Sequence, residues 1–162
     1  MTENKTILRL KSNVSADLYT LLTTGRVLVL TLKRDWYIKI ACGEKKEEYR
    51  IINEYWAKRF VDNYFLAKPY KYDSNQMQNS LKYFQNGGAL DLEPKGEKPF
   101  TGVAKEWDLI LFKNGHGKDS PITIVDSKGL EIKQGVERWG AVAKQFYFTH
   151  KLGDVRYTEP CS

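Results

Sequence analysis

The stretch Gly43-Glu44-Lys45-Lys46-Glu47-Glu48-Tyr49-Arg50 decides how the first half of this chain is arranged. A short amphipathic segment that contains Trp36 precedes it, and the apolar pair Ile51 and Ile52 follows at once. A charge-rich string of this kind is explained either by a solvated surface or by a polar pocket. Its apolar neighbours favour the pocket, because they tie the string to buried elements on both sides.

The string predicts a strand over residues 46–52, entered through a turn at Lys45. Side chains alternate along a strand, so Glu48 and Arg50 share one face and Glu47 points to the other, where we expect it at the surface. A lysine, a carboxylate and a guanidinium then converge, which suits a polar ligand. The simpler alternative is that Glu48 and Arg50 form cross-strand ion pairs at the mouth of a barrel, where exposure makes such pairs weak.

The segments around the string alternate between strand and helix patterns. Residues 27–32 are apolar and branched, as in a buried strand, and residues 33–42 carry apolar side chains spaced by four, as in a helix. A second helix is predicted from residue 53 or 54 to about residue 65. Upstream, the sequence predicts a strand or arm over 1–14 and a helix over 15–24, capped by serine and ended by glycine.

Residues 66–106 interrupt this pattern with prolines and glycines. Only residues 76–84 predict a short helix, and the rest is interpreted as an insertion or long excursion. The C-terminal third is rich in strand patterns. The predicted strands cover 107–112, 121–125 with an extension to 132, 144–151 and 152–157, and a glycine-rich turn covers 114–120.

Short strands with glycine-rich turns, together with helices early in the chain, predict an α+β fold around a small β-barrel with two or three flanking helices. The 162 residues are enough for a single domain with a substantial core. The formal net charge of +6 favours an anionic partner such as RNA, DNA or a nucleotide. Ordinary solubility is the alternative explanation of that charge.

The cysteines and the hydropathy of the chain indicate which cellular compartment and which kinds of binding site to expect. Cys42 and Cys161 form no CxxC pair and have no histidine cluster beside them, so the sequence indicates neither a metal site nor a cofactor. The start of the chain is polar, and the longest apolar run, 27–32, is far shorter than the ~20 residues that span a bilayer. We therefore expect a cytoplasmic protein without a membrane partner, with reduced thiols and with Cys42 packed as a small apolar residue.

The string resembles the motif Gly-x-Lys-x-x-[Glu/Thr]-x-Arg of the ASCH domain family, a branch of the PUA-like superfamily. Its form here is similar to that of bacterial and phage members. The resemblance covers roughly residues 27–65 and 107–155 and leaves 66–106 unmatched. The further blocks that are similar to that group are 30–33, 36–37, 55–59, 112–115, 128–132, 139–141 and 146–148.

The resemblance implies a PUA-like barrel with a cleft beside the Gly-x-Lys turn, in which ASCH domains are expected to bind RNA or nucleotides. In that cleft Lys45 and Arg50 would supply positive charge, and Glu48 would accept hydrogen bonds from a base amino group. Trp36 would stack on a base. The remaining candidate ligand-binding residues, which would contact the nucleic-acid backbone, are Lys113 and Lys118.

A second hypothesis is an amidohydrolase, since some small members of the family hydrolyse the amide of N4-acylated cytidines. The catalytic lysine of those enzymes falls on Lys45, and their threonine position falls on Glu48, which has no hydroxyl. Glu48 would then activate a water as a general base. The downstream catalytic glutamate falls on Glu137, with Glu131 as the alternative.

A third hypothesis is an accessory protein of a phage or mobile element that acts through protein contacts, with residues 66–106 as the contact surface. The chain has no Gly-x-Ser-x-Gly, HExxH or Cys/His nucleophile pattern, which disfavours protease, lipase and metallohydrolase chemistry. His116 is interpreted as a loop histidine without a catalytic role.

Overall fold

The structure is a computed structural model that describes residues 2–62, 74–91 and 102–160. The chain forms two compact units, each assembled from separated stretches of sequence. Unit 1 contains residues 1–46, 106–128 and 152–162, and unit 2 contains residues 47–105 and 129–151.

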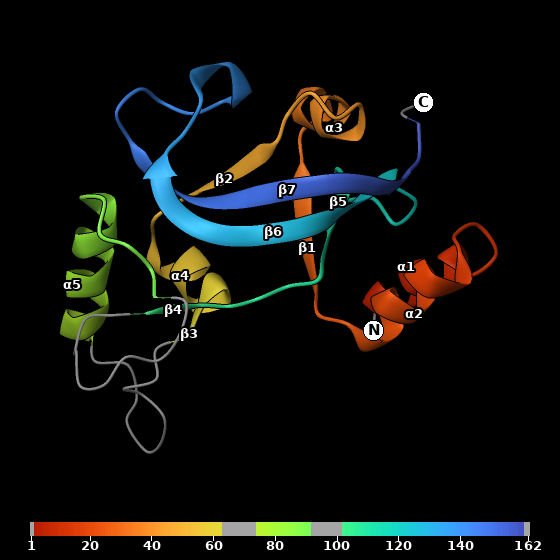
Figure 1. Cartoon of the computed structure of the whole chain (residues 1–162), viewed down its shortest axis with the longest axis horizontal. Coiled ribbons are helices and arrows are strands. Elements are labelled where there is room, and N and C mark those ends of the chain that lie inside the picture. The colour runs from red at the N-terminus through yellow and green to blue at the C-terminus, as the bar shows by residue number, and fades with distance from the viewer. Residues whose placement is uncertain (1, 63–73, 92–101, 161–162) are drawn as a thin grey trace. The chain divides into compact units, whose positions relative to one another are not determined.

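Helices and strands are interspersed along the whole described chain (Figure 1). The helices are α1 (Thr2–Leu10), α2 (Ala16–Thr24), α3 (Arg34–Ala41), α4 (Glu54–Phe60), α5 (Ser74–Gln85) and a short 3-10 helix (Glu137–Trp139). The strands are β1 (Val27–Leu32), β2 (Glu47–Ile51), β3 (Val61–Asp62), β4 (Val103–Ala104), β5 (Leu109–Asn114), β6 (Ile122–Gln134) and β7 (Phe146–Thr158).

Among the described residues, the main sheet has five strands in the order β1-β5-β6-β7-β2, and β3 pairs with β4 in a second, two-stranded sheet. Strands β1 and β5 are parallel, whereas β5 with β6 and β2 with β7 are antiparallel. The main sheet is curled and flanked by helices, so the expected α+β, barrel-like fold is confirmed.

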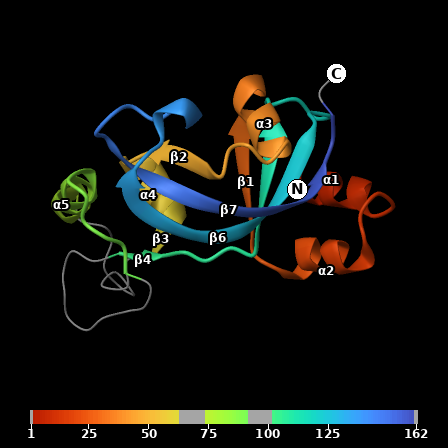
Figure 2. The same ribbon diagram turned by 45° about the horizontal axis from the view of Figure 1, so that its top comes forward.

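In unit 1, helices α1 and α2 lie side by side as a hairpin (Figures 1 and 2). This hairpin packs on one face of the sheet. The Ser15 hydroxyl accepts a hydrogen bond from the Leu18 backbone N–H at 3.2 Å and so caps α2, as the sequence predicts. The residues that bury this hairpin against β5 and β6 are apolar: Leu10, Leu18, Leu22, Leu109, Leu111, Ile122 and Ile124.

The parallel pair β1–β5 of unit 1 carries apolar side chains on both faces, fully buried on one face of β1 and half-buried on the other. Leu28, Leu30 and Leu32 point away from the α1–α2 hairpin and are buried, while Val27 and Val29 pack against the hairpin core. Parallel strands covered on both faces read as nearly continuous apolar runs, which explains the composition of β1 and the expectation of a buried strand there.

In unit 2, helices α4 and α5 supply the aromatic and apolar side chains that pack against β7. Phe60 of α4 and Phe84 of α5 are buried, with ring centroids 5.7 Å and 6.1 Å from that of Phe148. Met77, Leu81 and Phe84 recur every three or four residues along α5, so one face of the helix is apolar. The helix predicted over 76–84 is therefore confirmed, within an excursion of which 66–73 and 92–101 lie outside the described residues.

Two expectations for the first 42 residues are wrong. The segment 1–14 is expected as a strand or arm, but helix α1 covers most of it. Leu8 and Leu10 are two apart, as on a strand face, yet the helix turns Leu8 outward with 62% exposure and buries Leu10 completely. Cys42 is exposed instead of packed, because it follows the last turn of α3 at the C-cap.

Two predicted boundaries also differ from the structure. Helix α4 ends at Phe60, not near residue 65, because Val61 takes an extended conformation and pairs with Ala104 in the β3–β4 sheet. Strand β5 begins two residues later than expected, at Leu109, because Asp108 folds back on Arg26. The Arg26 backbone N–H donates a hydrogen bond to the Asp108 carboxylate at 2.8 Å. The Asp108 backbone N–H donates in return to the Arg26 carbonyl, also at 2.8 Å. No helix in the described part of the chain is long and apolar enough to cross a membrane.

Removing the N-cap of α4 should destabilise unit 2. The Asn53 side-chain oxygen accepts a hydrogen bond from the Trp56 backbone N–H at 3.0 Å. Asn53→Ala removes that acceptor, so we expect the free energy of unfolding, measured in urea, to fall by about 1 kcal/mol. Asn53→Asp keeps an acceptor and should unfold like the wild type. Equal losses in both variants would contradict the capping role.

Candidate functional site

The Gly43–Arg50 string leaves helix α3 through a tight turn. Gly43 has φ of +80°, a left-handed conformation that favours glycine, and so it ends the helix. The Lys45 backbone N–H donates to the Lys39 carbonyl at 2.9 Å, which folds the turn back on α3. The string then enters β2 at Glu47, so its first half belongs to unit 1 and its second half to unit 2.

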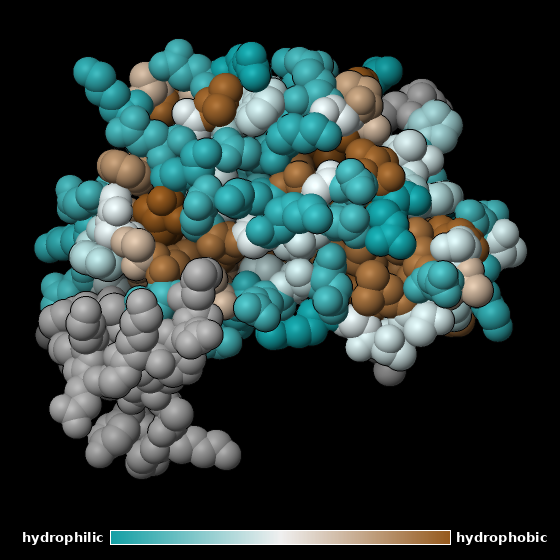
Figure 3. Space-filling view, in the orientation of Figure 1, coloured by the Kyte–Doolittle hydropathy of each residue, from teal (hydrophilic) through white to brown (hydrophobic). Residues whose placement is uncertain are grey.

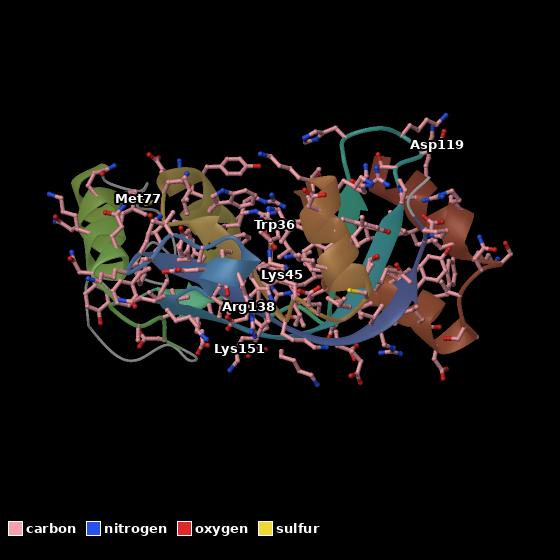
Figure 4. All side chains as sticks on the ribbon, turned by 90° about the horizontal axis from the view of Figure 1, so that it is seen from above. Trp36, Lys45, Met77, Asp119, Arg138 and Lys151 are labelled. Atoms are coloured by element: carbon pink, nitrogen blue, oxygen red, sulfur yellow. The ribbon has the colours of Figure 1, made fainter. Side chains whose placement is uncertain are left out.

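In unit 1, Lys45 is buried against Trp36. Its side chain is only 3% exposed, and its Nζ lies 4.9 Å from the centroid of the Trp36 ring. Figure 4 labels the two residues next to each other, Trp36 on α3 and Lys45 just before β2. The Lys39 Nζ lies 5.3 Å from the same ring, so the indole of Trp36 attracts two ammonium groups through its π face.

In unit 2, strand β2 carries a carboxylate toward each face. Glu48 pairs with His150 across the β2–β7 ladder and Glu47 pairs with Lys151, so the two glutamates point to opposite sides. Glu48 is 4% exposed and Glu47 is 8% exposed. The predicted alternation is thus confirmed, but the expectation that Glu47 lies at the surface is wrong.

The Glu48 carboxylate forms an ion pair with the Arg50 guanidinium, two residues along the same strand. Arg50 also donates to the Tyr49 carbonyl at 2.9 Å, and its guanidinium carbon lies 5.1 Å from the Trp56 ring centroid. The Arg59 guanidinium lies at the same distance from that ring. The expectation of a cross-strand ion pair is therefore wrong, because both partners come from strand β2. The Arg50 guanidinium packs on the Trp56 ring of α4.

His150 of β7 lies opposite Glu48 on the same face of the sheet. It is fully buried, and its ring meets that of Phe60 edge to face, with centroids 4.5 Å apart. Burial, together with the positive charges of Arg50 and Arg59, lowers the pKa of His150 from 6.5 to about 3. The imidazole is therefore neutral at physiological pH.

The opposite face of β2 is organised by Glu47 and Tyr49. The Glu47 carboxylate accepts hydrogen bonds from the Lys133 Nζ at 2.6 Å and from the Tyr49 hydroxyl at 2.8 Å. The Tyr49 hydroxyl in turn accepts from the Val136 backbone N–H at 2.9 Å. Burial raises the pKa of Tyr49, and the hydrogen bond to Glu47 raises the pKa of Lys133, so these groups keep their usual protonation at neutral pH.

The structure brings together some of the predicted site residues and leaves others apart. Trp36 meets Lys45 in unit 1, and Glu48 meets Arg50 in unit 2. Glu137 is exposed in the 3-10 helix next to Val136, which bonds Tyr49 on the opposite face of β2 from Glu48. Glu131, the alternative catalytic glutamate, lies 3.8 Å from the Lys151 ammonium. Lys113 and Lys118 line a separate cavity in unit 1.

Sequence reasoning missed three contributors to the surroundings of the string. His150 occupies an apolar position in the alternation of β7, and only the strand register places it opposite Glu48. Lys133 reaches Glu47 from a strand that starts 75 residues later, for which no local pattern exists. Trp56 lies in the helix predicted after the string, but no local pattern indicates that its ring contacts Arg50.

Within residues 2–62, 74–91 and 102–160, no group of three or more His, Cys, Asp and Glu side chains is placed to hold a metal ion. In comparisons with known proteins, no family model, no curated protein and no solved structure matches this chain.

Acid should destabilise the fold through His150. Since folding lowers the pKa of His150 from 6.5 to about 3, the unfolded chain binds a proton in that window and the folded chain does not. The stability that the folded chain gains from neutral His150 is fully present above pH 6.5. As the pH falls below this value, the free energy of unfolding decreases by at most about 1.4 kcal/mol per pH unit. Urea denaturation across this range should show a shallower pH dependence for His150→Phe than for the wild type.

The matched control for this experiment is His116, the other histidine of the chain, which is exposed. His116→Asn should keep the pH dependence of the wild type. Parallel wild-type and His150→Phe profiles between about pH 4 and pH 7 would show that His150 contributes no linkage.

Proposed function

We propose that this chain is an ASCH-type module that binds RNA or a nucleotide through residues of the Gly43–Arg50 string. One observation supports it above all: Lys45 and Glu48, two ionisable residues of one short string, are 3% and 4% exposed. Charged side chains are rarely buried unless they are paired, and they concentrate in this way at functional sites.

The unit 1 part of the string supplies a cation beside an aromatic ring. Lys45 is held in place by the Trp36 face, and its ammonium is a compact charge that suits a phosphate or a base carbonyl. Aromatic faces such as that of Trp36, which is half-buried, are the usual platforms for bases of single-stranded nucleic acids.

The unit 2 part supplies a fixed acceptor and a planar donor. Arg50 pairs with the Glu48 carboxylate, and a carboxylate oxygen is the acceptor that suits the amino group of cytosine, adenine or guanine. The Arg50 guanidinium is half-buried against Trp56 and suits a phosphate or the edge of a base. The net charge of +6 supports an anionic ligand as well.

The amidohydrolase alternative requires Glu48 to activate a water, and for that its ion pair with Arg50 must open. The proposed downstream residue, Glu137, is exposed in the 3-10 helix. A binding role makes no such demand on the pair, so it is the function that the geometry favours. The accessory-protein hypothesis rests on residues 66–106, of which only 74–91 and 102–106 are described.

The binding proposal predicts a salt-dependent affinity for single-stranded RNA, measured by fluorescence anisotropy. If Lys45 and Arg50 each contact one phosphate, a plot of log K against log salt concentration has a slope of about −1.4. Lys45→Ala should weaken binding and remove about half of that slope. Lys46→Ala takes the same charge from an exposed neighbour and should change affinity less than about twofold. Affinity that is indifferent to salt, or that Lys45→Ala changes no more than Lys46→Ala does, would sink the proposal.

The role of Glu48 predicts a base preference. Cytosine carries an amino group and uracil does not, so we expect oligo-C to bind more tightly than oligo-U, by about tenfold or more for one hydrogen bond to a charged group. Glu48→Gln should reduce this preference while leaving the salt slope intact. Incubation of the wild type with N4-acetylcytidine in the same series tests the alternative, since turnover that disappears in Glu48→Gln would establish the enzyme instead.

A further inference from the structure

Unit 1 contains a cavity that is independent of the Gly43–Arg50 string. Its volume is about 710 Å³, within the range of small-molecule sites in proteins. Helix α1, strands β1 and β5 and the β5–β6 loop line it. Figure 3 shows apolar side chains gathered in the part of the view where Figure 1 places α1 and α2, and Figure 4 labels Asp119 in the loop.

The floor of the cavity is aliphatic. Ile7 of α1, Val27 and Val29 of β1 and Leu111 of β5 line it, and the first three are half-buried side chains at the edge of the hairpin core. The aromatic ring among its described lining residues is that of His116, which lies in the β5–β6 loop and not on the strands of the floor. The floor therefore favours an aliphatic body over a nucleobase, which stacks on aromatic rings and needs hydrogen bonds at its edges.

The floor changes from apolar to polar along the parallel strands. In the β1–β5 register, Val29 stands opposite Leu111, and the next residues on this face, Thr31 and Lys113, stand opposite each other. The distance along β1 from Val27 to Thr31 is about 13 Å at the usual rise of a strand. A ligand that lies along the strands thus meets an apolar end and a cationic end.

The rim is strongly basic. Lys5, Arg9, Lys113 and Lys118 are four cationic lining residues against one anionic residue, Asp119. Arg9 is bound by the Glu159 carboxylate through two hydrogen bonds of 3.1 and 3.2 Å. The three lysines therefore provide the positive charge for a ligand.

We propose that this cavity binds a small amphiphilic anion, an unbranched aliphatic chain that ends in a carboxylate or a phosphate. The aliphatic chain lies on Val27, Val29 and Leu111, and the head group lies between Lys113 and Lys118. Ammonium groups at the end of an apolar floor match both halves of such a molecule, because charge-assisted hydrogen bonds fix the head and burial of methylenes supplies affinity.

A chain-length series tests the aliphatic half of the proposal. We would titrate the full chain with butanoate, hexanoate and octanoate, following the methyl NMR signals of Val27, Val29 and Leu111. Each buried methylene should tighten binding about fourfold until the cavity is filled. Octyl phosphate in parallel shows which head group is preferred. Affinity that does not change with chain length, or the absence of methyl shifts with every ligand, would overturn the proposal.

Variants test the two ends of the cavity separately. Lys113→Gln should weaken octanoate binding about tenfold or more, and Lys118→Gln, in an exposed loop, repeats the test should the first variant unfold. Lys33→Gln removes the same charge from an exposed position outside the cavity and should have no effect. Val29→Thr is nearly isosteric and should weaken octanoate binding much more than butanoate binding.

Adenosine monophosphate serves as the competing ligand. We expect it to shift the Val27, Val29 and Leu111 methyls weakly or not at all at concentrations at which octanoate saturates them. If it binds there more tightly than octanoate, the cavity is a nucleotide site and the proposal is wrong.

Discussion

The first three residues of strand β2 are buried and carry a carboxylate toward each face of the strand, and the fold of unit 2 depends on how those two charges are compensated. A carboxylate removed from water without partners costs several kcal/mol. Glu47 and Glu48 are therefore tolerated only because each finds a cationic partner. Removal of one partner would cost more than replacement of the whole pair by apolar residues, because it strands a buried charge.

The two compensations differ in kind. On one face the carboxylate of Glu47 links three separate segments, since Lys133 comes from β6 and Tyr49 carries the connection on to Val136 ahead of the 3-10 helix. That arrangement cross-links the backbone and is structural. On the other face, the partner of Glu48 comes from the same strand, and its guanidinium packs on the Trp56 ring of α4.

Local sequence patterns are sufficient for the elements whose own apolar run, periodicity or cap specifies them, such as β1, α2, α3 and α5. They were insufficient wherever a distant segment decides the outcome. The burial of Glu47 depends on Lys133, and the place of His150 beside the site depends on the register of β7 against β2. Helix α1 was mistaken for an extended segment because Leu8 and Leu10 satisfy a two-residue period by coincidence, and only docking on the sheet distinguishes the two patterns.

The ion pair between Arg9 and Glu159 joins residues 150 positions apart in sequence. Glu159 is itself held by the Ile122 backbone N–H and the Tyr157 hydroxyl, and its carbonyl accepts from the Tyr37 hydroxyl. During synthesis, α1 therefore leaves the ribosome on the order of ten seconds before the side chain that fastens it is made. In that interval the apolar face of the hairpin has no completed sheet to cover, which makes it a natural binding point for a chaperone on the nascent chain.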